Sequence, residues 1–204
     1  MEPLRLSAPV APGGTIGILG GGQLGRMLAL AAARLGFRTH VYSDEPDSPA
    51  FQVSALTTHA PYQDEGALRK FARTCHAITF EFENVPAESL ELVSCLAPAN
   101  PCVRSLTITQ DRLLEKNLVK ALGLATPAFA AADDEDTARL AFRDVSSRRA
   151  ILKTHRLGYD GKGQASVSSE AGVKTRRCVG GSSRSPAQHA KSSILPTRGS
   201  SSRR

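Results

Sequence analysis

The chain has 204 residues, 41% of them hydrophobic, so it can form one large domain or two small ones with a real core. No apolar run approaches the roughly 20 residues that a membrane span needs. The net charge of +7 comes from residues 165–204, which hold eight Lys and Arg and one acidic residue, whereas residues 1–164 hold 18 of each sign and offer no basic surface for nucleic acid.

The composition of the N-terminal extension and the spacing of the cysteines indicate the cellular compartment of the protein. Residues 1–13 contain three prolines and no long apolar core, which does not fit a secretory signal and leaves a plastid transit peptide open. The four cysteines lie far apart without a C-x-x-C pair, which disfavours a disulfide framework or a zinc site: Cys75, Cys95, Cys102 and Cys178. We therefore expect reduced thiols and a cytoplasmic location, with the plastid as the open alternative.

The folded part begins with a strand, a glycine loop and a helix. Thr15–Leu19 predicts a buried strand, and Gly20, Gly22 and Gly25 then match G-x-G-x-x-G. Apolar residues follow at helical spacing and predict one helical face: Leu24, Met27, Leu28, Ala31 and Leu35. Glycines let a ligand approach the backbone and a helix start offers unpaired N–H groups, so the loop predicts an anion site. A tight turn without a ligand is the alternative.

Strands and helices alternate through the rest of this first part. Further strands are predicted at residues 38–43, 55–59 and 77–83. One helix is expected after an N-cap at Asp64, and another at about 87–96. The alternation predicts an α/β fold with a parallel sheet, whose ligands bind at the carboxyl ends of the strands.

A proline-containing loop separates the second part. The spacing predicts one long helix over residues 105–122, stopped by Gly123. A helix over 134–142 and a strand over 150–153 follow.

These elements divide into a domain at residues 14–100 and a partial one at 101–164, followed by a tail. Residues 165–204 contain eleven serines and eight basic residues without hydrophobic periodicity. Such a segment cannot bury enough apolar surface to offset its ordering entropy, so we expect a disordered tail.

A second glycine loop and a lysine suggest phosphate binding. Gly158–Gln164 has three glycines around Lys162, which suits a mobile flap of N–H groups over phosphates. It is not the Walker pattern, because no Ser or Thr follows the lysine at the required place. Lys153 stands in an apolar strand, where its burial needs an anionic partner such as a nucleotide phosphate. An ordinary hairpin beside an exposed edge lysine is the alternative.

Three other charged residues are weighed on spacing alone. Glu81 and Glu83 alternate with phenylalanines in the predicted strand, so both carboxylates are expected on one face beside the first glycine loop. Glu83 is the candidate to bind an amine or hydroxyl and Glu81 the weaker one, against the alternative of a solvated strand end. Arg112 fits a solvated helix face. No metal-ligand spacing or catalytic triad can be assembled, so the catalytic residues stay unassigned and no metal site is predicted.

Four motifs together resemble the 5-(carboxyamino)imidazole ribonucleotide synthase family, an ATP-grasp ligase family of purine biosynthesis. The motifs appear in the family's order and approximate spacing, over about residues 14–164: Gly20–Met27, Thr79–Pro86, Gln110–Arg112 and Gly158–Gln164. The resemblance implies a Rossmann-like pre-ATP-grasp domain followed by the beginning of an ATP-grasp domain. It implies a reaction that joins bicarbonate to the amine of aminoimidazole ribonucleotide with ATP hydrolysis, through carboxyphosphate.

The resemblance also implies roles for named residues. The first glycine loop would hold the ribose 5-phosphate end of aminoimidazole ribonucleotide, with substrate contacts from Gly22, Gln23, Leu24 and Glu83. The ATP contacts would be Arg112, Lys153, Gly158, Tyr159, Asp160, Gly161, Lys162, Gly163 and Gln164. Lys153, the loop amides and Mg²⁺ would neutralise phosphate charge.

Family members continue for roughly as long again, and that part would hold the Mg²⁺ ligands and the adenine-binding strand. We expect weak affinity for phosphorylated ribonucleotides, little or no ligase activity of the chain alone, and a homodimer only for a full-length chain. The Ser- and Arg-rich tail has the look of out-of-frame translation, and without the rest of the domain the strand ending at Lys153 would expose an unpaired edge.

Two other functions stay open on the sequence. Asp44 follows the glycines by about 20 residues, where a dinucleotide-binding fold holds its ribose, so an NAD-dependent oxidoreductase domain is one alternative. The other is a polyanion-binding module that uses the basic tail. The tail has no aromatic residue to stack on bases, so specific recognition of nucleic acid is not expected.

Overall fold

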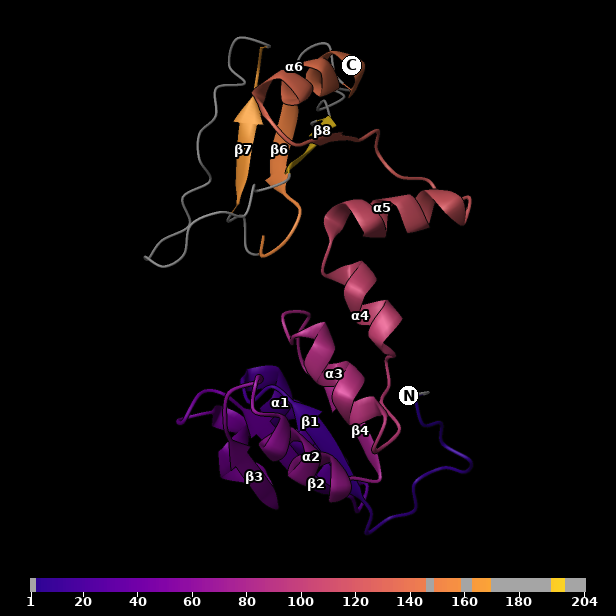
Figure 1. The fold of residues 1–204 in the computed structure, drawn as a ribbon, viewed down its shortest axis with the longest axis vertical. Coiled ribbons are helices and arrows are strands. Elements are labelled where there is room, and N and C mark those ends of the chain that lie inside the picture. The colour runs from indigo at the N-terminus through magenta and orange to yellow at the C-terminus, as the bar shows by residue number, and fades with distance from the viewer. Residues whose placement is uncertain (1–2, 146–148, 159–162, 170–191, 197–204) are drawn as a thin grey trace, which may run out of the picture. The chain divides into compact units, whose positions relative to one another are not determined.

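The computed structural model describes residues 3–145, 149–158, 163–169 and 192–196. The chain folds as two compact units, Met1–Thr107 and Ile108–Arg204. The described part of each unit contains a four-stranded sheet (Figure 1). No helix in these ranges is long and apolar enough to cross a membrane.

The first unit is built on a parallel sheet with the strand order β3-β2-β1-β4. The strands are β1 (Thr15–Leu19), β2 (Arg38–Ser43), β3 (Leu56–His59) and β4 (Ala77–Phe80). The helices are α1 (Gln23–Arg34), α2 (Glu65–Arg73) and α3 (Ala87–Ser94), with a 3-10 helix η1 (Pro49–Val53). The predicted α/β class is confirmed, and Asp64 caps α2 as expected by accepting from the N–H of Ala67.

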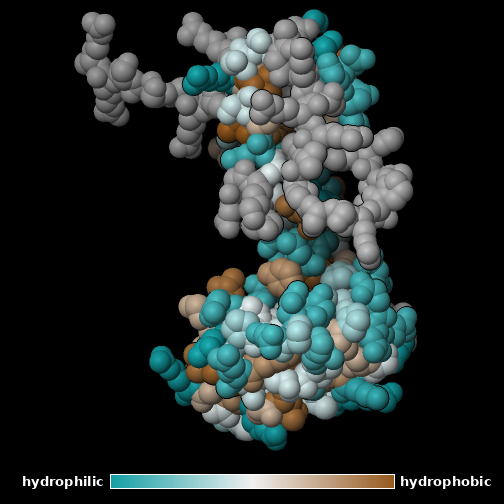
Figure 2. All heavy atoms as spheres, turned by 90° about the vertical axis from the view of Figure 1, so that its left-hand side faces the viewer, coloured by the Kyte–Doolittle hydropathy of each residue, from teal (hydrophilic) through white to brown (hydrophobic). Residues whose placement is uncertain are grey.

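Helix α1 packs through small residues and not through the predicted leucine face. Its buried residues are Gly25 and Ala29, and a Cβ on Gly25 would lie 2.7 Å from the carbonyl oxygen of Gly20. This close approach requires glycine at position 25. The larger apolar residues of the predicted face are exposed: Leu24, Met27, Leu28 and, at the C-cap, Leu35. On the face shown in Figure 2, hydrophobic residues lie scattered among hydrophilic ones over the first unit.

Strand β4 ends at Phe80, three residues before the predicted end. It pairs with β1 only as far as Leu19, where β1 itself ends. The N–H of Glu81 makes the last bond of this ladder, to the carbonyl of Leu19 at 3.0 Å. Beyond it the chain has no strand partner and turns, so Glu81 and Glu83 do not stand on one strand face as predicted.

The second unit contains an antiparallel sheet with the order β5-β8-β6-β7. The strands are β5 (Ala130–Ala132), β6 (Ala150–Thr154), β7 (Gln164–Val167) and β8 (Ser192–Pro196). The helices are α4 (Val103–Thr109), which spans the boundary between the units, α5 (Arg112–Ala121) and α6 (Glu135–Val145). Figure 1 shows α6 lying against this sheet, where Ala138, Ala141 and Phe142 pack on Ala150 and Val167.

The predicted long helix over residues 105–122 is two helices. Asp111 breaks it with an extended backbone and caps α5, accepting from the N–H groups of Leu113 at 2.9 Å and Leu114 at 3.2 Å. Gly123 ends α5 with a φ of 72°, as expected. The break places Arg112 at the first position of α5, so Arg112 does not lie in the middle of a solvated face.

The tail is not wholly without structure, which corrects the prediction for residues 165–204. Strand β7 runs into it, and β8 lies near its end. Both pair through backbone hydrogen bonds with β6, and this pairing needs no apolar periodicity in the added strands. Lys153 faces Gln164 on one side and Ser193 on the other, so the strand that carries it is central and not the predicted open edge.

Candidate functional site

The first glycine loop closes around the carboxylate of Glu81. The N–H of Gly22 donates to Oε1 at 2.6 Å, and the N–H of Gly25 donates to Oε2. These N–H groups stand at the start of α1, where a helix favours an anion. The anion site that the glycine pattern predicted is therefore present, but a side chain of the same unit already fills it.

The predicted substrate residues divide into two groups. Gly22 is half-buried and holds Glu81. Gln23 and Leu24, at the start of α1, and Glu83, in the turn after β4, are exposed. The hydrogen bonds of Glu81 connect the start of α1 with the turn after β4. Sequence reasoning ranked Glu83 ahead of Glu81 as a substrate contact, and that ranking stays a prediction.

The second unit brings the predicted ATP-binding cations together. The backbone N–H of Arg112 donates to the carbonyl of His155 at 2.9 Å, which ties the start of α5 to the chain just after β6. Burial lowers the pKa of Lys153, and the positive charges of Arg112 and Lys116 lower it further. A cluster of like charges of this kind is stabilised by a bound anion, which removes part of the repulsion.

Lys116 belongs to this cluster, and sequence reasoning missed it. It lies four residues after Arg112 in α5, a spacing that puts two side chains on one helical face. The signal was hidden because the predicted long helix gave no reason to prefer one face over another. Nζ of Lys116 donates to Oγ1 of Thr126 at 2.7 Å and stands 6.0 Å from the ring centre of Phe129, which holds the side chain against the segment that leads into β5.

Acidic and imidazole groups flank the cations. The carboxylate of Asp111 lies 3.8 Å from Nε of Arg156 and 4.0 Å from Nδ1 of His155. His155 is buried, with 7% of its surface exposed. These contacts hold the segment after β6 against the start of α5, so the N-cap residue Asp111 lies in the same region as the cation cluster.

The second glycine loop is described only at its two ends. Gly158 follows β6, while Gly163 and Gln164 lead into β7. Gly163 has a φ of 68°, and a Cβ there would lie 2.6 Å from Oγ1 of Thr154, so this end of the loop requires glycine. Tyr159, Asp160, Gly161 and Lys162 lie outside the described residues, and their predicted role stays a prediction.

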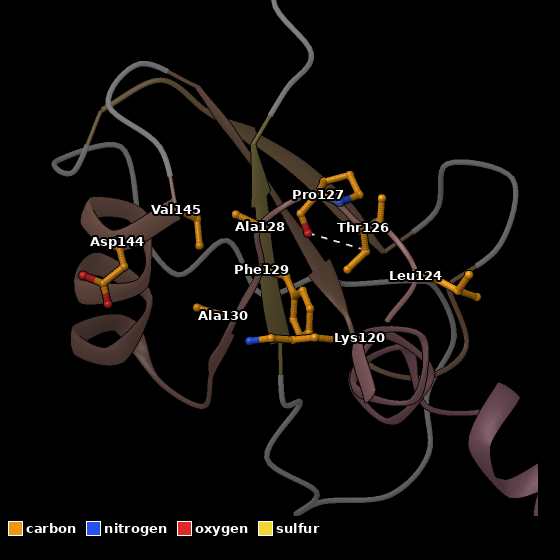
Figure 3. Close-up of a pocket in the computed structure, with 10 residues that line it drawn as sticks. Lys120, Leu124, Thr126, Pro127, Ala128, Phe129, Ala130, Asp144 and Val145 are labelled. Atoms are coloured by element: carbon orange, nitrogen blue, oxygen red, sulfur yellow. Dashed lines mark hydrogen bonds between the residues drawn. The ribbon is translucent and has the colours of Figure 1, made fainter. Parts of the chain in front are cut away.

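A cavity of about 520 Å³ lies elsewhere in the second unit, between the end of α5, the segment that leads into β5 and the end of α6 (Figure 3). Lys120, Thr126, Phe129 and Asp144 are among its lining residues. Among the residues that the structure describes, no predicted site residue lines it. Within the described ranges, no group of three His, Cys, Asp or Glu side chains is placed to hold a metal ion.

Both units of the chain match known protein domains. A family model for the ribonucleotide synthetase pre-ATP-grasp domain matches residues 14–110, and one for the ATP-grasp domain matches residues 117–185. The N5-carboxyaminoimidazole ribonucleotide synthase of Brucella melitensis is 44% identical over 158 residues, which are 78% of this chain and 43% of that protein. The enzyme of Pseudomonas aeruginosa is 44% identical over 162 residues, 78% of this chain and 44% of its own.

A solved structure of an enzyme of the same name also matches this chain. The crystal structure of an ADP complex of N5-carboxyaminoimidazole ribonucleotide synthetase has a TM-score of 0.82 and 34% identity, and the match covers 93% of this chain and 48% of that one. The chain belongs to the N5-carboxyaminoimidazole ribonucleotide synthase family. It spans less than half the length of these relatives.

Membership of the synthase family removes the nicotinamide alternative. The glycine loop and Asp44 fall in a pre-ATP-grasp domain, and the ATP-grasp match covers β6 and β7 together with the loop between them. The loop amides that would hold a dinucleotide pyrophosphate are bonded to Glu81. Most of the basic tail lies outside the described residues, so its binding of polyanions stays a prediction.

Proposed function

We propose that the chain carries the aminoimidazole ribonucleotide site and part of the ATP site of an N5-carboxyaminoimidazole ribonucleotide synthase. The reaction joins bicarbonate to the amine of aminoimidazole ribonucleotide and converts ATP to ADP and phosphate. The first unit, with the domain predicted at residues 14–100, takes the ribonucleotide. The second, with the domain predicted at 101–164, takes ATP.

The gathering of three cations in the second unit carries the proposal. Arg112 and Lys116 in α5 and Lys153 in β6 come from elements that are distant in sequence, and burial, together with the positive charges of Arg112 and Lys116, lowers the pKa of Lys153. A triphosphate would relieve this repulsion and gain charge-assisted hydrogen bonds. During phosphoryl transfer the same cations would offset the charge that moves onto the leaving and transferred groups.

The second glycine loop also belongs to the proposed part of the nucleotide site. The loop from Gly158 to Gln164 begins four residues after the end of β6, the strand that carries Lys153, and its N–H groups would bind the phosphates. ATP would arrive with Mg²⁺, and the described residues include no cluster of metal ligands, so no residue of this chain is assigned to the ion.

The ribonucleotide would bind at the exposed residues around the first glycine loop. Glu83 is exposed and can accept a hydrogen bond from an amine or hydroxyl, and Gln23 and Leu24 lie at the exposed start of α1. Gly22 would contact the ligand through its backbone while its N–H remains with Glu81. In this proposal the ribose 5-phosphate is therefore not bound by the amides of Gly22 and Gly25, which differs from the role that the family resemblance implied for the loop.

ATP binding to single-charge variants tests the proposal. In calorimetric titrations, Arg112→Ala and Lys153→Ala should each weaken ATP binding by about 10- to 100-fold, the value of one charge-assisted contact. Lys120→Ala removes the same charge from an exposed position of the same helix and should leave the affinity within about twofold. Equal effects of all three variants would show that ATP responds only to net charge, and the proposed site would be wrong.

A further inference from the structure

The backbone of the first glycine loop lies so close to the side chain of Glu81 that added side chains at Gly20 and Gly22 would collide with it. A Cβ on Gly20 would lie 2.4 Å from Cγ of Glu81, and one on Gly22 would lie 2.8 Å from its Oε1. Gly20 also has a φ of 107°, which side chains rarely adopt. The glycine pattern in this chain is thus required by the seating of Glu81, without any bound ligand.

Glu81 occupies the hydrogen-bond donors that a bound phosphate would otherwise use. Its two oxygens accept from Gly22 and Gly25 at the start of a twelve-residue helix, the donors that a G-x-G-x-x-G loop offers to a pyrophosphate. A carboxylate in this place has the sign of charge that the helix favours, and it satisfies N–H groups that otherwise lack a partner. A phosphate could use the same donors only after Glu81 has left them.

We propose that Glu81 is the resident anion of the first glycine loop and a specificity-determining residue that keeps phosphate groups out of it. The loop then excludes dinucleotides, and a ribonucleotide meets it through its neutral groups while its phosphate is held elsewhere. This last point rests on the proposed function for the identity of the substrate. The exclusion of phosphates follows from the loop geometry and holds for any substrate.

Amide NMR with inorganic pyrophosphate as the probe tests the exclusion. In the unaltered chain, pyrophosphate should leave the amide signals of Gly22 and Gly25 in place. In Glu81→Ala it should shift both signals saturably, with affinity higher by roughly tenfold or more, since each freed donor offers a charge-assisted bond. Glu88→Ala removes a carboxylate from an exposed position of α3 and should behave like the unaltered chain.

Glu81→Gln keeps the shape of the side chain and removes its charge, which covers the case of a poorly folded alanine variant. Without any ligand, it should move the amide protons of Gly22 and Gly25 upfield, because a carboxylate is the stronger acceptor. Pyrophosphate shifts at these glycines in the unaltered chain, or no upfield change in Glu81→Gln, would overturn the proposal. Signals near Arg112 and Lys153 report separately on the ATP site, so failure of one proposal is distinguishable from failure of the other.

Discussion

Acid should destabilise the first unit through His40. This side chain is 6% exposed, with Nδ1 2.6 Å from Oγ1 of Thr74 and Nε2 2.8 Å from Oγ1 of Thr58. Its ring meets Phe71 edge-on, with 4.8 Å between the ring centres. Burial lowers the pKa of His40 from 6.5 to about 4, because the charged ring would lose its solvation.

The pH dependence follows from where the proton binds. Between pH 6.5 and 4 the unfolded chain binds a proton at His40 and the folded unit does not, so the free energy of unfolding falls as the pH falls. The full shift corresponds to about 3 kcal/mol, and about 2 kcal/mol of it is lost between pH 7 and pH 5. For a unit of this size, the melting temperature should drop by roughly 10 °C over that interval.

Thermal unfolding of the unaltered chain, His40→Gln and His59→Gln tests the predicted drop in melting temperature. Near-UV circular dichroism of tyrosine follows the first unit, since Tyr42 and Tyr62 both lie in its core. His40→Gln stays neutral at every pH and should lose most of the drop, although it is less stable at pH 7. His59→Gln makes the same change at an exposed position of β3 and should retain the drop. Equal slopes of melting temperature against pH in the unaltered chain and His40→Gln would refute the reasoning.

Two further predictions concern cysteine reactivity and the cap of α5. Iodoacetamide should label Cys102 well before Cys75. Cys102 is exposed and hydrogen bonding to a nearby serine lowers its pKa, whereas burial raises the pKa of Cys75 to about 11. Equal labelling of the two cysteines in peptide mass spectra would contradict this prediction. Asp111→Ala should destabilise the second unit by about 1 kcal/mol in urea unfolding, because it frees the first N–H groups of α5. Asp111→Asn retains a capping oxygen and should cost clearly less, whereas an equal loss would assign the effect to the charge.

The first unit could be predicted well where local pattern decides the structure. The strands β1 and β2 fall where apolar runs predicted them, and the parallel sheet follows from their alternation with helices. The end of β4 could not be read in the same way, because it depends on where its partner β1 stops. That one difference turns the Glu81 side chain into the glycine loop, a contact that the alternation of the two carboxylates did not predict.

The second unit shows where composition misleads. Strands β7 and β8 lie in a segment without apolar periodicity and form because β6 offers unpaired backbone groups on both sides. Such pairing joins residues far apart in the sequence, which local pattern does not reveal. The break at Asp111 did carry a signal, since aspartate is a preferred N-cap, but the apolar spacing over residues 105–122 was given more weight.

The most direct test of the account is to locate both ligands on the chain by amide NMR. Aminoimidazole ribonucleotide should shift the signals of Gln23, Leu24 and Glu83 in the first unit. ATP should shift those of Arg112 and Lys153, with their neighbours, in the second. ATP shifts concentrated at the first glycine loop, or ribonucleotide shifts confined to the second unit, would contradict the assignment of the two sites.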